Sequence, residues 1–147
     1  MKICMACSAG GHLAEILQLM PAVEKEDVFF VTYMHMNSTN LKYKKYFVSN
    51  VNKNPLDWVK NTVKSFFIML KERPKLIITT GAGVAVPSCL FGKLFGSKII
   101  YIEGFARVNS KSATSKFMYP FADIFLVQWK GLLKLYGKKA EYHGAVF

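Results

Sequence analysis

Acidic residues are scarce in this sequence of 147 residues. Nine Asp and Glu stand against 20 Lys and Arg, which gives a formal net charge of +11 at pH 7. Such an excess predicts an anionic partner, and the candidate classes are nucleic acid, anionic lipid and a phosphorylated substrate. Long apolar runs are also missing. Because no stretch approaches the roughly 18 residues of a membrane span, we expect no transmembrane helix.

Cysteine is rare as well, with three residues in the whole chain. Cys4 and Cys7 form a C-x-x-C spacing, but residues three apart in a strand point to opposite faces of the sheet. We therefore expect small buried core residues rather than a chelating or redox pair. The low cysteine content and the lack of a leader-like segment favour a cytoplasmic setting. We predict neither a metal site nor a cofactor.

Two common phosphate-binding motifs are missing. The first glycine-containing turn lacks the G-x-G-x-x-G spacing, and the second expected strand ends in Thr32 and Tyr33 without an acidic residue for a ribose. No G-x-x-x-x-G-K-[ST] occurs either. These absences argue against a dinucleotide-binding protein and against a P-loop nucleotidase.

What the sequence does contain is a regular alternation of short apolar runs and helical patterns. We expect strands at Lys2–Cys7, Val28–Tyr33, Tyr46–Ser49, Leu76–Thr79, Lys98–Glu103 and Ile124–Gln128. We expect helices at Leu13–Met20, Leu56–Glu72, Val84–Phe95, Ala113–Tyr119 and Lys130–Tyr136, with Pro21, Pro74 and Gly96 as stops. This alternation predicts an α/β fold with a Rossmann-like, doubly wound parallel sheet in a single domain over residues 1–147.

Two glycine-containing loops follow the first and fourth expected strands. In the common doubly wound order these strands are neighbours at the topological switch point, so the loops should face one crevice. Free backbone amides at two helix starts would then favour an anion. The alternative is that the glycines only permit tight turns. The candidate phosphate-binding residues are Ser8, Gly10, Gly11, Gly81, Ala82 and Gly83.

Two side chains near this crevice are candidates for proton transfer. His12 follows the first pair of glycines, where the helix dipole disfavours the cationic ring. Glu103 ends a buried strand at the same edge of the sheet, where a carboxylate suits a general base or a hydroxyl anchor. The alternatives for Glu103 are a salt bridge to Arg107 or a helix cap.

The helical pattern at Leu56–Glu72 combines apolar residues at three-and-four spacing with lysines on the remaining surface. Such a helix is suited to a membrane interface, with Lys60 and Lys64 on anionic headgroups and Trp58 and Phe67 at the apolar boundary. An ordinary sheet-covering helix with a solvated basic edge is an equally good interpretation.

Four co-linear blocks carry a resemblance to a known family, and it spans nearly the whole chain. It resembles the asparagine-linked-glycosylation subunit fourteen family and its bacterial PssD-like relatives in capsule and exopolysaccharide assembly. That family is similar to the N-terminal half of a GT-B glycosyltransferase of the MurG type. The blocks are Ser8–His12, Thr79–Pro87, Ile102–Val108 and Tyr119–Trp129.

The resemblance implies an acceptor-side subunit of an inverting glycosyltransferase. A second protein would supply the half that binds the UDP-sugar, which is UDP-GlcNAc or a related hexose or hexuronic acid donor. This chain would hold a lipid-linked diphosphate acceptor at Ser8, Gly10, Gly11, Gly81, Ala82, Gly83 and Arg107. His12 or Glu103 would be the base, and transfer by the isolated chain is expected to be feeble or absent.

The resemblance also bears on location. Eukaryotic members begin with a membrane-spanning helix, whereas Met1 here leads directly into the first expected strand. We therefore expect a bacterial-type, peripheral protein at the inner face of the cell membrane, attached to anionic lipid through the basic amphipathic surface. The alternative function is a basic Rossmann-like module that binds nucleic acid or another polyanion. As a glycosyltransferase subunit, the chain is expected to bind no nucleic acid.

Overall fold

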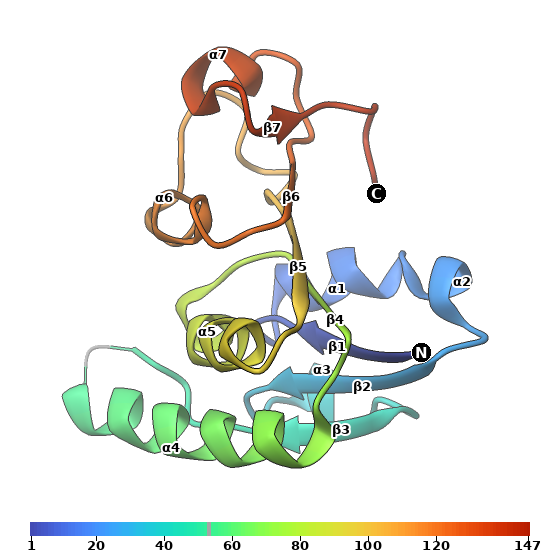
Figure 1. The fold of residues 1–147 in the computed structure, drawn as a ribbon, viewed down its shortest axis with the longest axis vertical. Coiled ribbons are helices and arrows are strands. Elements are labelled where there is room, and N and C mark those ends of the chain that lie inside the picture. The colour runs from blue at the N-terminus through green and yellow to red at the C-terminus, as the bar shows by residue number, and fades with distance from the viewer. Residues whose placement is uncertain (53) are drawn as a thin grey trace.

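The computed structural model describes residues 1–52 and 54–147 (Figure 1). The described strands form one seven-stranded parallel sheet in the order β3-β2-β1-β4-β5-β6-β7. The order reverses between β1 and β4, so the predicted switch point is confirmed. The strands are β1 (Lys2–Ala6), β2 (Asp27–Thr32), β3 (Lys44–Phe47), β4 (Leu76–Thr79), β5 (Lys98–Ile102), β6 (Ile124–Leu126) and β7 (Ala140–Glu141).

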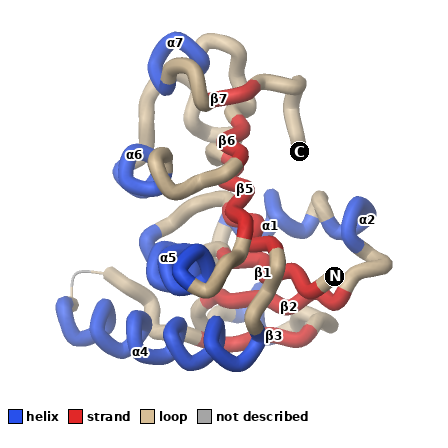
Figure 2. Tube along the Cα trace, in the orientation of Figure 1, coloured by secondary structure: helices blue, strands red, loops and turns tan. Residues whose placement is uncertain are grey.

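Helices cover both faces of this sheet (Figure 2). The layer beneath α1 and α2 includes Leu13 and Met20, and the layer on the opposite face includes Met69 of α4 and Cys89 of α5. The fold is therefore the expected doubly wound α/β arrangement. The helices are α1 (Gly11–Leu17), α2 (Met20–Val23), α3 (Met36–Thr39), α4 (Pro55–Glu72), the 3₁₀ turn η1 (Gly83–Ala85), α5 (Val86–Leu94), α6 (Ala113–Met118) and α7 (Leu132–Tyr136).

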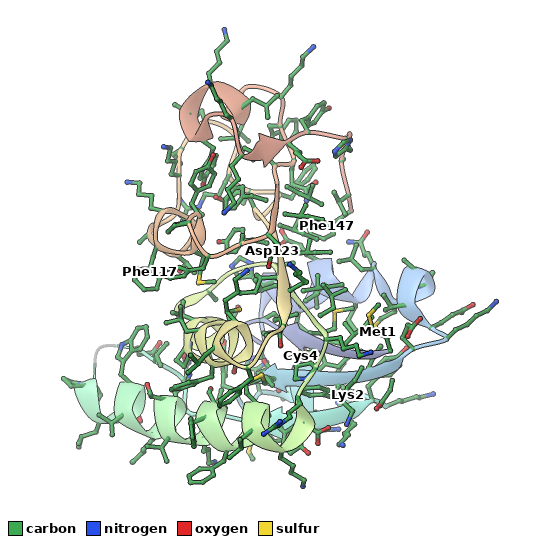
Figure 3. The ribbon with its side chains drawn as sticks, viewed as in Figure 1. Met1, Lys2, Cys4, Phe117, Asp123 and Phe147 are labelled. Atoms are coloured by element: carbon green, nitrogen blue, oxygen red, sulfur yellow. The ribbon has the colours of Figure 1, made fainter. Side chains whose placement is uncertain are left out.

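Successive residues of β1 enter different core layers. Cys4, which is labelled in Figure 3, and Ala6 belong to the layer under α4 and α5. Ile3 and Met5 belong to the layer under α1. This follows from the two-residue repeat of a strand that is buried on both faces, and it explains the nearly continuous apolar run.

The cysteines are buried thiols on different faces, as predicted. Cys4 and Cys7 lie in opposite core layers, and all three cysteines are free. Burial raises the pKa of Cys7 and of Cys89 to about 12. The thiols therefore stay protonated at neutral pH, which does not suit nucleophilic or metal-binding roles.

Several element boundaries differ from those expected. The third strand is Lys44–Phe47 rather than Tyr46–Ser49, because this edge strand tolerates basic residues whose ammonium groups find partners: Lys44 pairs with Glu72 at 2.8 Å. The first helix ends at Leu17, and Pro21 is in the first turn of α2 instead of stopping a helix. The short elements α2, α3 and β7 carry too little periodicity to be predicted.

Helix α4 is rotated so that much of its apolar stripe faces outward. The side chains of Val59 and Phe67 are 60% and 62% exposed, while the polar residues Asn61 and Ser65 are fully buried. The interpretation as an ordinary sheet-covering helix is therefore incomplete, since α4 covers the sheet with only part of its apolar surface. Neither α4 nor any other helix in the described ranges is long and apolar enough to cross a bilayer.

A buried polar network explains this rotation. The Asn61 amide donates to the carbonyl oxygens of Ser49 at 3.2 Å and Val84 at 3.0 Å. Ser65 Oγ donates to Asn61 Oδ1 at 2.8 Å and accepts from Ser88 Oγ at 3.0 Å. Because buried polar groups require partners, these bonds fix one face of α4 against η1 and α5.

Candidate functional site

A cavity of about 680 Å³ opens at the carboxyl edge of the sheet. This is the edge where ligands bind in doubly wound folds. Its walls come from the start of α1, the loops after β4 and β5, and the start of α6. The lining residues are Gly11, His12, Glu15, Ala82, Tyr101, Glu103, Gly104, Ala106, Arg107, Ser112, Ala113 and Thr114.

The two glycine-containing loops lie together, as predicted from the strand order. Thr80 Oγ1 donates to the His12 carbonyl oxygen at 3.1 Å, which ties the loop after β4 to the first turn of α1. Gly11 and Ala82 then line the same cavity. The loops therefore build one site, although they are 68 residues apart in the chain.

The second loop contains glycine for packing reasons. Gly81 has a φ of +98°, and a Cβ there would lie 2.7 Å from Tyr101 Oη. A Cβ on Gly83 would lie 3.2 Å from Val51 and 3.3 Å from Trp58, on the side of α4. Neither glycine lines the cavity. The alternative of a tight turn thus accounts for Gly81 and Gly83 better than phosphate contact does.

The first loop is different. A Cβ on Gly10 or on Gly11 would meet nothing within 4 Å, and neither glycine has a positive φ. The chain therefore does not need glycine there for its own packing. Gly11 lines the cavity, whereas Ser8 and Gly10 do not. The missing side chain at Gly11 leaves free volume directly above the first turn of α1.

Glu15 extends the predicted pair of proton-transfer candidates. It lies one turn after His12 on α1, with Glu15 Oε2 at 3.5 Å from His12 Nδ1. Its other oxygen accepts a hydrogen bond of 3.0 Å from the backbone amide of Phe105. Sequence reasoning missed Glu15, although the i, i+3 spacing places it on the same helix face as His12 and was a usable signal.

Glu103 is 2% exposed and is held by donors from three segments. Its Oε1 accepts from the Gly104 amide at 3.3 Å and from Ser112 Oγ at 3.4 Å, and its Oε2 accepts from the Tyr136 hydroxyl. Burial, and then the hydrogen bond to Glu103, raise the pKa of Tyr136, so this phenol remains a donor. The pKa of Tyr101 is also raised, mainly by burial and to a smaller extent by the negative charge of Glu103.

The alternatives for Glu103 were a salt bridge to Arg107 and a helix cap, and neither is observed. Ser112, not Glu103, caps α6 by accepting from the Ser115 amide. Arg107 is exposed at the cavity wall and pairs with no carboxylate of the described residues. Its guanidinium is available to an anionic ligand. Tyr136 was not predicted, and its distance of 33 residues from Glu103 gave no sequence signal.

The predicted membrane residues lie along α4. Lys60 and Phe67 are exposed, and the Lys64 ammonium reaches the Phe47 carbonyl oxygen at 3.3 Å. Trp58 is 39% exposed because its ring packs beside Gly83. In the described part of the chain, no three His, Cys, Asp or Glu side chains are grouped as metal ligands.

The strand order and the position of the cavity define a class of fold, the Rossmann-like α/β domain with its cavity at the carboxyl edge of the sheet. Acinetobacter baumannii MurG superposes with a TM-score of 0.79 at 14% identity, over 96% of this chain and 45% of that one. The UDP-N-acetylglucosamine 2-epimerase of Rickettsia bellii gives a TM-score of 0.79 at 11% identity, over 99% and 45%. The chain thus spans less than half of each neighbour, and these likenesses concern the fold.

The chain belongs to the Alg14-like family. The family described as "Oligosaccharide biosynthesis protein Alg14 like" matches residues 48–146. The UDP-N-acetylglucosamine transferase subunit alg14 of Schizosaccharomyces pombe is 32% identical, over 94% of this chain and 80% of its own length. Mouse ALG14, which carries the same description, is 24% identical over 99% and 83%.

Proposed function

We propose that this chain is the acceptor-side subunit of a two-chain, UDP-GlcNAc-dependent, inverting glycosyltransferase. It binds a lipid-linked diphosphate acceptor, and a second protein supplies the half that binds the UDP-sugar. The observation that carries this proposal is the cavity at the carboxyl edge of a single Rossmann-like sheet. In GT-B-type proteins two such sheets enclose the active site, and this chain corresponds to 45% of MurG.

The cavity suits the acceptor. Gly11 leaves room above the first turn of α1, Arg107 supplies a positive charge, and His12 supplies a group that can take a proton. We assign the acceptor diphosphate to Gly11, Ala82 and Arg107. The cavity walls do not include Ser8, Gly10, Gly81 and Gly83. We assign these four residues a supporting role, in which the backbone of the two loops positions Gly11 and Ala82.

The outward face of α4 is the proposed membrane contact. It presents the exposed apolar side chains of Val59, Val63 and Phe67 next to the exposed Lys60 and Lys64. Exposed apolar surface beside basic residues is typical of peripheral attachment to anionic lipid. The chain would work at the inner face of a cell membrane, in lipid-linked oligosaccharide, capsule or exopolysaccharide synthesis.

The double variant Val63→Glu, Phe67→Glu is expected to bind phosphatidylglycerol-containing vesicles at least about tenfold more weakly than wild type. Two apolar contacts with the lipid are lost, and two negative charges are added. Both side chains are at least 50% exposed, so the fold should remain intact. Vesicle sedimentation measures the effect. The matched control is Leu135→Glu on α7, which is 42% exposed and far from α4 in Figure 1. Equal binding by the double variant and wild type would contradict the α4 assignment.

Transfer of radiolabelled GlcNAc from UDP-GlcNAc to a lipid-diphosphate acceptor tests the subunit assignment. We expect transfer by the purified complex with the donor-binding chain and little or none by either chain alone. Robust transfer by this chain alone would overturn the two-chain proposal. Tight nucleic-acid binding at physiological salt, without a co-purifying glycosyltransferase chain, would support the polyanion-binding alternative.

A further inference from the structure

Two unpartnered polar atoms face each other beside the cavity. His12 Nδ1 and Glu15 Oε2 are buried, are 3.5 Å apart, and have no hydrogen-bond partner among the described residues. His12 nevertheless lines the cavity, and 36% of its side chain is exposed. Buried polar atoms are normally satisfied, so this pair requires an explanation.

The Glu15 carboxylate is fixed by the loop after β5. The Phe105 amide donates to Glu15 Oε1 at 3.0 Å, which turns Oε2 toward His12. A Cβ on Gly104 would lie 3.4 Å from His12 Cε1 and 3.7 Å from Glu15 Oε2. A side chain at position 104 would therefore be in van der Waals contact with both groups, which places the loop after β5 beside the His12–Glu15 pair.

A carboxylate facing Nδ1 selects one form of the neutral ring. A carboxylate oxygen only accepts, so the proton of the imidazole belongs on Nδ1 and the lone pair on Nε2. Nε2 is then the atom that can take a proton from a ligand in the cavity. This is the role that an acidic partner of a catalytic histidine has in other enzymes.

Glu103 does not compete for this role. Both of its oxygens accept hydrogen bonds from the protein, and its side chain is almost completely buried. Its donors come from the segments that carry β5, α6 and α7. The arrangement is that of a carboxylate that holds the cavity walls together.

We propose that Glu15 is the positioning residue that orients His12 as the general base, and that Glu103 is not the base. This inference rests on the proposed function. The acceptor hydroxyl oxygen forms a bond to the anomeric carbon of the sugar while the bond from that carbon to the UDP oxygen breaks. The hydroxyl proton passes to His12 Nε2 and UDP leaves.

The other titratable or charged groups in the cavity are Tyr101, Glu103 and Arg107.

The first test needs only the isolated chain. Long-range ¹H–¹⁵N correlation of the neutral His12 ring should show a protonated Nδ1 and an unprotonated Nε2. In Glu15→Gln the amide oxygen still accepts from Phe105, but an NH₂ group faces Nδ1, so the Nε2-protonated tautomer should become dominant. The control Glu24→Gln removes the same charge from an exposed position near α2 and should leave the ring unchanged. A wild-type ring protonated on Nε2, or one insensitive to Glu15→Gln, overturns the proposal.

The second test uses the complex with the donor-binding chain. Glu15→Gln should lower kcat by about 10- to 100-fold with little change in the KM of the acceptor, and Glu15→Asp should restore part of the rate. A rise in KM at unchanged kcat, or a loss of rate equal in Glu15→Asp and Glu15→Gln, would assign Glu15 a structural role and overturn the proposal. Absence of transfer by the wild-type complex would instead overturn the proposed function, while the ring measurement still decides the orientation of His12.

Discussion

Replacing His12 with asparagine is expected to lower sugar transfer by the proposed two-chain enzyme by about 10²- to 10⁴-fold, the usual contribution of a general base. Asparagine keeps a polar group near the place of Nδ1, facing Glu15 Oε2. It removes the group that lies at Nε2. Because 36% of the side chain is exposed at the cavity, the free energy of unfolding should change by less than about 0.5 kcal/mol.

The matched control for this variant is His35→Asn. His35 caps α3 and accepts a hydrogen bond from the Asn37 amide at 3.3 Å, and asparagine is a good helix cap. It lies outside the cavity walls, so transfer should stay near wild type. Initial rates with saturating UDP-GlcNAc and acceptor give the comparison. A His12→Asn complex with wild-type kcat would exclude His12 as the base.

The second large effect is on stability and concerns Glu72, at the end of α4. Glu72 is 4% exposed, and its carboxylate pairs with the ammonium groups of Lys2 at 3.0 Å and Lys44 at 2.8 Å. It also accepts a hydrogen bond from the Tyr46 hydroxyl. Lys2 is labelled in Figure 3. Burial acts to raise its pKa, but the hydrogen bonds from Lys44, Tyr46 and Lys2 outweigh burial and lower the pKa to about 2. The group joins α4 to β1 and β3.

A lowered pKa stabilises the folded state at neutral pH. The ordinary value is 4.5, so the contribution is fully present above about pH 4.5 and is lost as the pH falls toward about 2. The difference corresponds to about 3 kcal/mol of unfolding free energy at pH 7. Glu72→Gln should cost about 2 to 3 kcal/mol at pH 7, since the two lysines can still reach water.

Urea denaturation at pH 7 and at pH 3 measures both effects. The wild-type midpoint should fall much more between these pH values than the midpoint of Glu72→Gln. The remaining decrease in the variant includes Asp123, whose pKa is also lowered by Lys93 and the Ile99 amide against the effect of burial. Glu24→Gln, which is exposed, should follow wild type. If the midpoints of Glu72→Gln and wild type fell equally between pH 7 and pH 3, the interactions of Glu72 would be excluded as the cause of the acid destabilisation.

The sequence predicted the parts of the fold that depend on local pattern. Apolar runs separated by helical patterns gave most of the strands, and the known order of doubly wound sheets correctly placed the loops after β1 and β4 together. It also brought His12 and Glu103 to one cavity. These predictions succeeded because burial on both faces of a parallel sheet leaves a strong signal in the sequence.

Features that depend on tertiary partners could not be predicted in this way. Helical periodicity identified the apolar stripe of α4 but not the direction it faces, because the rotation is set by hydrogen bonds to Val84 and Ser88. The hydrogen bond from Tyr136 to Glu103 joins residues 33 apart in the chain, so no local pattern indicates it. The basic strand β3 was misplaced by two residues, since the counter-charge that accommodates Lys44 comes from the distant Glu72.

The buried network of Asn61, Ser65 and Ser88 gives the two sides of α4 unequal mutational tolerance. Hydrogen bonds demand particular donors and acceptors, so few substitutions are compatible with folding on the inward side. The exposed positions, among them Val59, carry almost no such requirement. Sequence drift there is free as far as folding is concerned, so purifying selection would keep these positions apolar only if the proposed membrane contact holds.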